Sequence, residues 1–118
     1  HPREEGKVLG VTAPGIGGIS TSGDAERGFW RYGVRYGHIL DPRTGEPARD
    51  TLSVTVACRK AEEADALSTT LYVLGPDRGL GLLQAHPGCH AVFVRTADQP
   101  GEFRLIESPG FAWADAPR

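Results

Sequence analysis

The sequence lacks methionine, has only two cysteines and contains no long apolar run. Two cysteines are too few for a disulfide framework, and their spacing matches no usual metal motif. No segment is long and apolar enough to span a bilayer, and no signal peptide is present. A basic tract and interleaved basic and aromatic residues are also missing, and the net charge is −2. We therefore expect no nucleic-acid partner.

The remaining composition is that of a globular domain. The 118 residues are 39% hydrophobic and 24% charged, which favours one domain or part of one. A chain that begins with His1 and lacks methionine is expected to be a processed product or an excerpt of a longer sequence. We expect Cys58 and Cys89 to be small buried apolar groups. A single bridge between neighbouring strands is the alternative.

Hydrophobic periodicity and turn residues predict mostly strands. The predicted strands cover residues 6–13, 19–23, 29–32, 34–40, 51–59, 90–96 and 101–110, and 29–32 with 34–40 form a hairpin. A helix is predicted from residue 61 to the Gly75-Pro76 pair, and a second helix over 77–85. Residues 14–18 are predicted as a turn, 41–50 as a loop and 111–118 as irregular. The expected fold class is α+β, with two helices packed on one face of a mostly antiparallel sheet.

Two polar side chains of the first predicted helix are a candidate metal site. Asp65 and Thr69 are four residues apart, so they share one helix face. A carboxylate and a hydroxyl are hard oxygen ligands, which suit Mg²⁺ completed by phosphate and water. The alternative is a carboxylate that complements the helix dipole and a threonine that bonds to the preceding turn.

A second polar cluster follows the turn at 14–18. Its hydroxyls, a glycine and one arginine could hold a phosphate or a ribityl chain. The alternative is a solvated strand end. The cluster comprises Ser20, Thr21, Ser22, Gly23, Asp24, Glu26 and Arg27.

A histidine lies at the end of a predicted strand, just before a tight turn. His38 could accept a proton from an attacking hydroxyl near neutral pH. Asp41 is expected to cap the turn through nearby backbone, Pro42 to fix its entry and Gly45 to adopt a positive φ. The alternative is a solvent-facing histidine above an ordinary turn.

Three blocks, STSGDAER (20–27), HILDPRTGEP (38–47) and EADALSTTLYVLGPDRGL (63–80), occur in an order and spacing that resemble one family. They are similar to the C-terminal part of the ApbE-type FAD:protein FMN transferases, and SPGF (108–111) adds to the similarity. The resemblance covers nearly the whole chain. It implies one segment, 1–118, that forms the C-terminal portion of an ApbE-like domain whose upstream half is absent.

The resemblance also implies an activity. Family members transfer FMN from FAD to a Thr or Ser hydroxyl in a flavinylation motif of an acceptor protein, and release AMP with the help of Mg²⁺. By position, Asp65 and Thr69 resemble the side-chain metal ligands, and His38 a histidine beside the flavin phosphates. The expected flavin-binding residues are Ser22, Gly23, Arg27, His38, Ile39, Asp41, Thr44 and Gly45.

The sequence departs from the family in two ways. Ala25 stands where the family often has an aromatic residue, and members are much longer. The absent upstream part is expected to supply most contacts to the isoalloxazine and adenine rings, and a backbone oxygen for the metal. Two other functions would use the same residues: an FAD pyrophosphatase that gives FMN and AMP, and a non-catalytic flavin-binding module.

Overall fold

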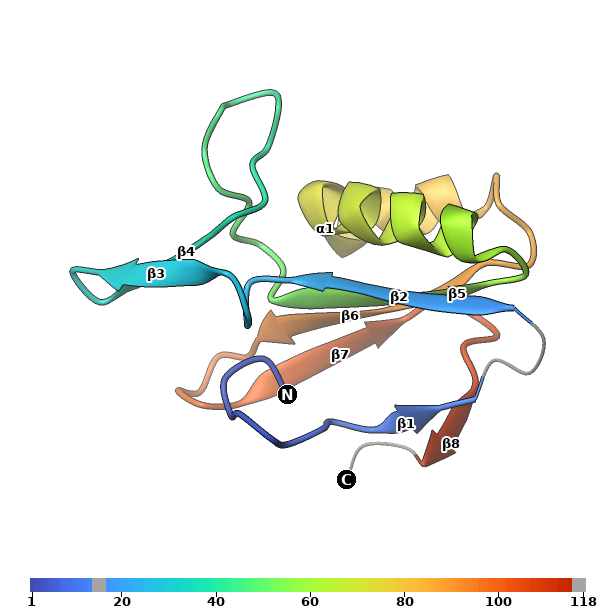
Figure 1. Cartoon of the computed structure of the whole chain (residues 1–118), viewed down its shortest axis with the longest axis horizontal. Coiled ribbons are helices and arrows are strands. Elements are labelled where there is room, and N and C mark those ends of the chain that lie inside the picture. Colours follow the sequence, from blue (N-terminus) through green and yellow to red (C-terminus); the bar gives the residue numbers. More distant parts are fainter. Residues whose placement is uncertain (14–16, 116–118) are drawn as a thin grey trace.

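A computed structural model describes residues 1–13 and 17–115, and its centre is an antiparallel sheet under a helix (Figure 1). The strands are β1 (Val11–Thr12), β2 (Gly18–Gly23), β3 (Gly28–Arg31), β4 (Val34–Gly37), β5 (Ser53–Cys58), β6 (His90–Thr96), β7 (Phe103–Glu107) and β8 (Trp113–Asp115), and the helix is α1 (Ala61–Leu83). The α+β class predicted from the sequence is confirmed. No helix in the described ranges is long and apolar enough to cross a membrane.

The main sheet has the strand order β2-β5-β6-β7, and every neighbouring pair is antiparallel. Side chains of β5 alternate in burial, so Val54, Val56 and Cys58 point to the face that α1 covers. Ala91 and Phe93 of β6 join the same core. The alternation explains why β5 could be predicted from the sequence, because its buried residues recur at every second position, as in a strand with one buried face.

Helix α1 replaces the two helices predicted from the sequence. The predicted boundary is visible as a break, because Gly75 has φ 72 and ψ 173 and is followed by Pro76. The helix resumes at once, since proline is tolerated in a first helical turn, and the two predicted segments form one element. The second half packs tightly on the sheet: a Cβ at Gly79 would lie 2.9 Å from Phe93 Cζ. The two predicted helices are thus found as two adjacent segments of one element, α1, divided at Gly75.

The elements outside the main sheet differ most from the prediction. Residues 6–13 were predicted as a strand, but only Val11–Thr12 form one, which pairs with β8. Strand β8 lies in the tail that was predicted to be irregular, and it exists because β1 is beside it. The predicted hairpin is present as β3–β4, but its second strand ends at Gly37 and not at Leu40. The turn predicted over 14–18 falls mainly on residues outside the described ranges.

Cys58 and Cys89 form a disulfide, which was the less favoured of the two expectations. The sheet register explains the pairing. Ala57 of β5 pairs with His90 of β6, so the next residue on β5 and the preceding residue before β6 fall opposite each other. Both cysteines are buried, as expected.

The SPGF segment locks the start of β6 to the end of β7. The Ala91 N–H donates to Ser108 Oγ at 2.8 Å, and the Ser108 N–H donates to the Ala91 carbonyl at 2.8 Å. His90 Nδ1 lies 2.8 Å from the Pro109 carbonyl. Gly110 has φ 85, and a Cβ there would lie 2.8 Å from the His90 ring. The segment has a structural part in the fold.

Candidate functional site

Hydroxyl groups of β2 meet the first turns of α1 in one hydrogen-bonded network. Ser20 Oγ donates to Asp65 Oδ1 at 3.2 Å and lies 3.1 Å from Ser68 Oγ. Ser22 Oγ lies 2.8 Å from Ser68 Oγ and 3.0 Å from Thr69 Oγ1. The candidate metal ligands Asp65 and Thr69 are thus linked to the serines of the second predicted cluster. We refer to these five side chains as the hydroxyl network.

Local periodicity explains this arrangement. Ser20 and Ser22 are two residues apart on a strand, so both point toward α1, while Thr21 points to the other face and contacts Thr55. Asp65 and Thr69 are separated by about one helical turn. Ser68 Oγ also donates to the Asp65 carbonyl at 3.0 Å, which fixes the serine at the centre of the network.

An open cleft of about 1520 Å³ extends over the face of the main sheet that α1 does not cover, where Thr21, Thr55 and Val92 line it. Of the hydroxyl network, Ser22 and Thr69 line the cleft, and Asp65 does not. The walls of the cleft include residues 1–10, β2 and parts of the segment 23–40. Small-molecule sites in proteins usually measure about 300–1,000 Å³, so the cleft is large enough for a dinucleotide. The predicted site residues that line it are Ser22, Gly23, Arg27, His38, Ile39 and Thr69. Three separate sequence blocks therefore meet at one cleft.

His38 is held by a backbone carbonyl. Its Nδ1 lies 3.2 Å from the Arg27 carbonyl oxygen, and its side chain is exposed in the cleft. A carbonyl oxygen only accepts hydrogen bonds, so Nδ1 of the neutral imidazole carries the proton. The remaining nitrogen, Nε2, then has a free lone pair and is able to accept a proton.

The turn after His38 has the predicted local structure but does not line the cleft. Asp41 Oδ1 accepts from the Arg43 N–H at 2.9 Å, and the Asp41 carbonyl accepts from the Gly45 N–H at 2.8 Å. The Arg43 side chain, by its hydrogen bonds, lowers the pKa of Asp41 to about 2. Gly45 has φ 72, as expected, and Thr44 Oγ1 accepts from the Glu46 N–H. Of the predicted flavin-binding residues, Asp41, Thr44 and Gly45 thus lie apart from the others.

A buried carboxylate organises the wall beside Gly23. Asp24 is 6% exposed, and its two oxygens accept from Arg3 at 2.7 and 2.9 Å. Arg35 donates to the Asp24 carbonyl at 2.5 Å. A Cβ at Gly37 would lie 2.8 Å from the Asp24 Cβ, so the strand end just before His38 needs glycine.

Asp24 also affects the buried Tyr72. Burial of Tyr72, followed by the negative charge of Asp24, raises the pKa of the Tyr72 hydroxyl to about 12.

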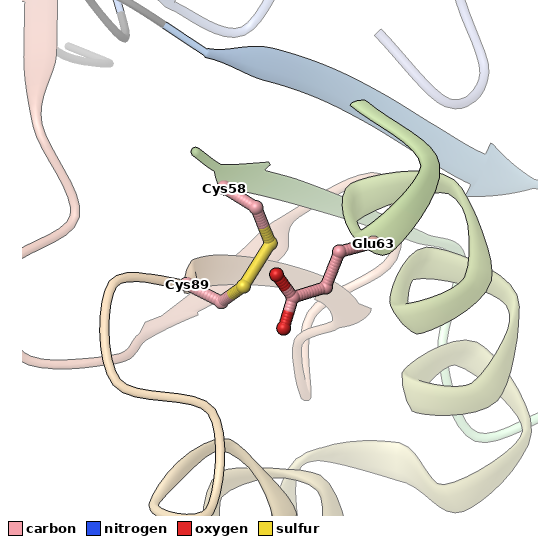
Figure 2. A group of neighbouring side chains, drawn as sticks. All are labelled: Cys58, Glu63 and Cys89. Carbon is pink, nitrogen blue, oxygen red and sulfur yellow. A yellow bond between two sulfur atoms is a disulfide. The ribbon is translucent and has the colours of Figure 1, made fainter. Parts of the chain in front are cut away.

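The oxygen atoms of the hydroxyl network fit a hard divalent cation. Asp65 supplies a carboxylate, which accepts from Ser20 Oγ, and Thr69 supplies a hydroxyl, which lies beside Ser22 Oγ. Within the described ranges, the only group of three His, Cys, Asp or Glu residues close enough to hold a metal is Cys58, Glu63 and Cys89 (Figure 2). The two sulfurs of that group are bonded to each other, so they are not free ligands.

Two residues of the site were missed from the sequence. Ser68 is fully buried at the centre of the network, and Arg3 of the N-terminal segment donates to Asp24, which the second predicted cluster already contained. For Ser68 a signal existed, because it stands in the helix stripe that otherwise carries Ala64, Leu67 and Leu71. A hydroxyl in an apolar stripe needs a partner. For Arg3 no signal was present, since its partner is 21 residues away.

The model of the ApbE family matches residues 1–93. The chain belongs to the ApbE family. The match covers all five residues of the hydroxyl network, the His38 turn and most of the cleft wall. The resemblance noted from the sequence is confirmed.

Named relatives and solved structures agree with the family. An FAD:protein FMN transferase of Treponema pallidum is 47% identical over 77 residues, which are 64% of this chain and 21% of that protein. The enzyme of the same name from Escherichia coli K12 is 48% identical over 95 residues, 80% of this chain and 26% of that protein. The ApbE protein of Thermotoga maritima superposes with a TM-score of 0.63 at 42% identity, over 77% of this chain and 28% of that one. Flavinyl transferase ApbE of Pseudomonas stutzeri gives 0.63 at 41% identity, over the same shares.

The chain spans between about a fifth and three tenths of the length of these relatives. The matched structures also share its α+β architecture, so the fold is that of a part of an ApbE protein.

Proposed function

We propose that this chain is the C-terminal portion of an FAD:protein FMN transferase. In this reaction, a Thr or Ser hydroxyl of an acceptor protein attacks the FMN phosphorus of FAD. A new P–O bond forms, the pyrophosphate bond breaks, and AMP leaves. The observation that carries the proposal is that Ser22 and Thr69, at the edge of the hydroxyl network, line the same cleft as His38.

His38 is proposed to take the proton of the attacking hydroxyl. Its Nε2 is the free acceptor, because Nδ1 is bound to the Arg27 carbonyl. A histidine suits this place better than a carboxylate, since a second negative charge would repel the phosphates. The Asp41 turn is proposed to support His38 from outside the cleft, because Asp41 is occupied by Arg43 and does not line it.

Asp65 and Thr69 are proposed to hold Mg²⁺, with Ser20, Ser22 and Ser68 orienting their oxygen atoms. The ion, when bound, would neutralise charge on the pyrophosphate oxygens. Ser22, Gly23 and Arg27 are proposed to bind the flavin phosphate or ribityl chain from the adjacent wall. The guanidinium of Arg27 supplies positive charge, and Gly23 leaves backbone accessible.

The test is AMP release from FAD, measured by chromatography with Mg²⁺ and with a chelator, in the complete protein. We expect Asp65→Ala to lower metal-dependent release at limiting Mg²⁺ by about a hundredfold or more. Asp98→Ala is a matched control, because Asp98 is exposed in the turn between β6 and β7. Unchanged release in Asp65→Ala would contradict the metal assignment.

An acceptor peptide separates the remaining possibilities. Flavin fluorescence on the peptide shows transfer, whereas AMP and free FMN without labelled peptide show a pyrophosphatase. Flavin binding with no AMP release in the complete protein would favour a non-catalytic module.

A further inference from the structure

The hairpin β3–β4 projects from the body of the protein and leads directly into the candidate site (Figure 1). Strand β4 ends at Gly37, and the next residue is His38. Because His38 is proposed to receive the proton of the acceptor hydroxyl, a macromolecule that brings this hydroxyl must pass close to the hairpin.

One side of the hairpin carries aromatic and basic side chains. Phe29 pairs with Tyr36 and Arg31 with Val34, and alternate residues of a strand share a face, so these four lie on one side. The rings of Phe29 and Tyr36 stack at 5.3 Å. We refer to these four residues, with Tyr32 at the tip, as the hairpin face. Exposed aromatic residues beside arginine are typical of protein-binding surfaces.

The tip residue is held in an unfavourable conformation. Tyr32 has φ 50 and Gly33 φ 74, as in a type I′ turn, where glycine, asparagine or aspartate is usual. Tyr32 is the one residue other than glycine with a positive φ among those described. Its side chain is 90% exposed, so burial within this chain does not offset the cost of the conformation. Strain of this kind clusters at binding sites, which points to an external partner for the ring.

The charge of the hairpin and its unpaired strand edges indicate what kind of partner would bind there. Residues 27–38 contain no aspartate or glutamate, Arg31 lies on the hairpin face, and the guanidinium of Arg49 lies 4.7 Å from the centre of the Tyr36 ring. The other two arginines of the segment lie elsewhere, because both line the cleft. Within the described part of the chain, β3 and β4 form a sheet of two strands, so each has an edge that pairs with no other strand. Such edges accept an extended segment as an added strand.

We propose that the hairpin face docks an extended, acidic segment of the acceptor protein and delivers its hydroxyl to His38. The proposal rests on the proposed transferase function. It adds a specificity surface to that function, made of residues outside the cleft: Phe29, Arg31, Tyr32, Val34 and Tyr36 do not line it.

The test uses two synthetic peptides, each with one threonine, flanked by aspartates in one and by asparagines in the other. FMN incorporation by the complete protein is followed by flavin fluorescence. We expect the aspartate peptide to have the lower KM, and Arg31→Glu to remove this preference with a rise in KM of about fivefold or more. The KM for FAD should stay unchanged, and added salt should weaken the preference of the unaltered protein.

Two further variants control for folding and for charge. Tyr32→Asn suits the left-handed turn and removes the ring, so it should raise the peptide KM while the fold is kept. Arg104→Glu makes the same charge change on β7, where Arg104 is exposed and distant in sequence, and should leave the preference intact. Equal KM values for both peptides, or a preference that survives Arg31→Glu, would overturn the docking surface alone. Absence of both AMP release and peptide labelling in the unaltered protein would overturn the transferase function, and the docking proposal with it.

Discussion

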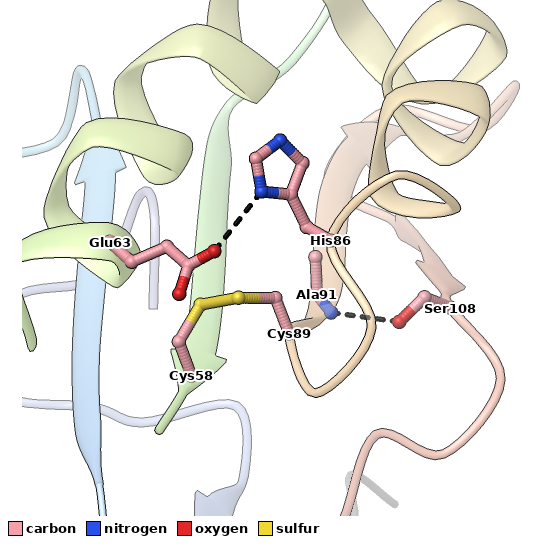
Figure 3. The surroundings of a disulfide bond; sticks show 6 residues. All are labelled: Cys58, Glu63, His86, Cys89, Ala91 and Ser108. Carbon is pink, nitrogen blue, oxygen red and sulfur yellow. Dashed lines mark hydrogen bonds and ion pairs between the residues drawn. A yellow bond between two sulfur atoms is a disulfide. The ribbon is translucent and has the colours of Figure 1, made fainter. Parts of the chain in front are cut away.

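The disulfide between Cys58 and Cys89 gives a stability prediction whose size follows from the chain path. The two residues, drawn in Figure 3, are 31 positions apart in the sequence. The bond closes a loop that contains the whole of α1, since α1 runs from Ala61 to Leu83. In the chain-entropy model, closing a loop of this length removes about 3.7 kcal/mol of conformational freedom from the unfolded state. Typical domains are stable by about 5–15 kcal/mol, so reduction should remove a large share of the stability.

The assay is urea unfolding of the oxidised and the dithiol-reduced chain, followed by tryptophan fluorescence and circular dichroism. With a urea slope of about 2 kcal/mol per molar, the midpoint should fall by about 2 M on reduction. The matched control is Cys58→Ala with Cys89→Ala, which should not respond to the reductant. Alanine is chosen because both cysteines belong to the apolar core, where a serine hydroxyl would need a partner.

Two results would refute this reasoning. Equal midpoints with and without reductant would mean that the bond does not constrain the unfolded chain as calculated. Alkylation of two free thiols in protein prepared without reductant would mean that the bond does not form. Glu63 and His86, which lie 3.1 Å apart beside the bond, would still connect the first turn of α1 to the segment after it (Figure 3).

Two further predictions concern titratable groups. Burial raises the pKa of Tyr72 to about 12, whereas the unfolded value is about 10. The stability that the protonated side chain contributes is therefore complete below pH 10 and is lost as the pH rises toward 12. Over this range, the urea midpoint of the unaltered protein should fall more steeply than that of Tyr72→Phe. His38→Ala should lower the rate of FMN transfer by about a hundredfold or more, as expected for loss of a general base, with a much smaller change in the Kd for FAD measured by flavin fluorescence. Equal losses in rate and binding would make His38 a binding residue.

Much of the main sheet could be predicted because its strands carry their own signals. Both ends of strand β6 were predicted correctly. In β5, apolar residues alternate with others along the sequence, and the buried residues of the strand follow the same alternation. Strand β8 could not be predicted, because three residues of an Ala-rich tail become a strand only by pairing with β1. The break at Gly75 and the helical segment beyond it were both predicted, but the sequence did not show that the two segments are adjacent parts of one element, because the Gly-Pro pair is also a common helix end.

The candidate site was predictable in part for a similar reason. Spacing placed Asp65 and Thr69 on one helix face, but only the sheet arrangement brings Ser20 and Ser22 to them. The disulfide depended on the register of β5 and β6, which neither cysteine reveals in the sequence. Asp41 kept its local part in the turn, yet its orientation toward Arg43 separates it from the cleft. Local sequence patterns thus predicted the helices and strands, whereas the side chains that meet in the site are set by contacts between elements that are distant in the sequence.

The hydroxyl network is able to interact with either a cation or an anion. Each hydroxyl donates one hydrogen and offers two lone pairs, and in the contacts among Ser20, Ser22, Ser68 and Thr69 either atom is able to be the donor. Rotation of the hydrogens alone can reverse the bonds among these four hydroxyls, whereas the bonds that Ser20 and Ser68 donate to Asp65 keep their direction. The same oxygen atoms can therefore turn lone pairs toward a cation or hydrogens toward a phosphate, without moving a single heavy atom.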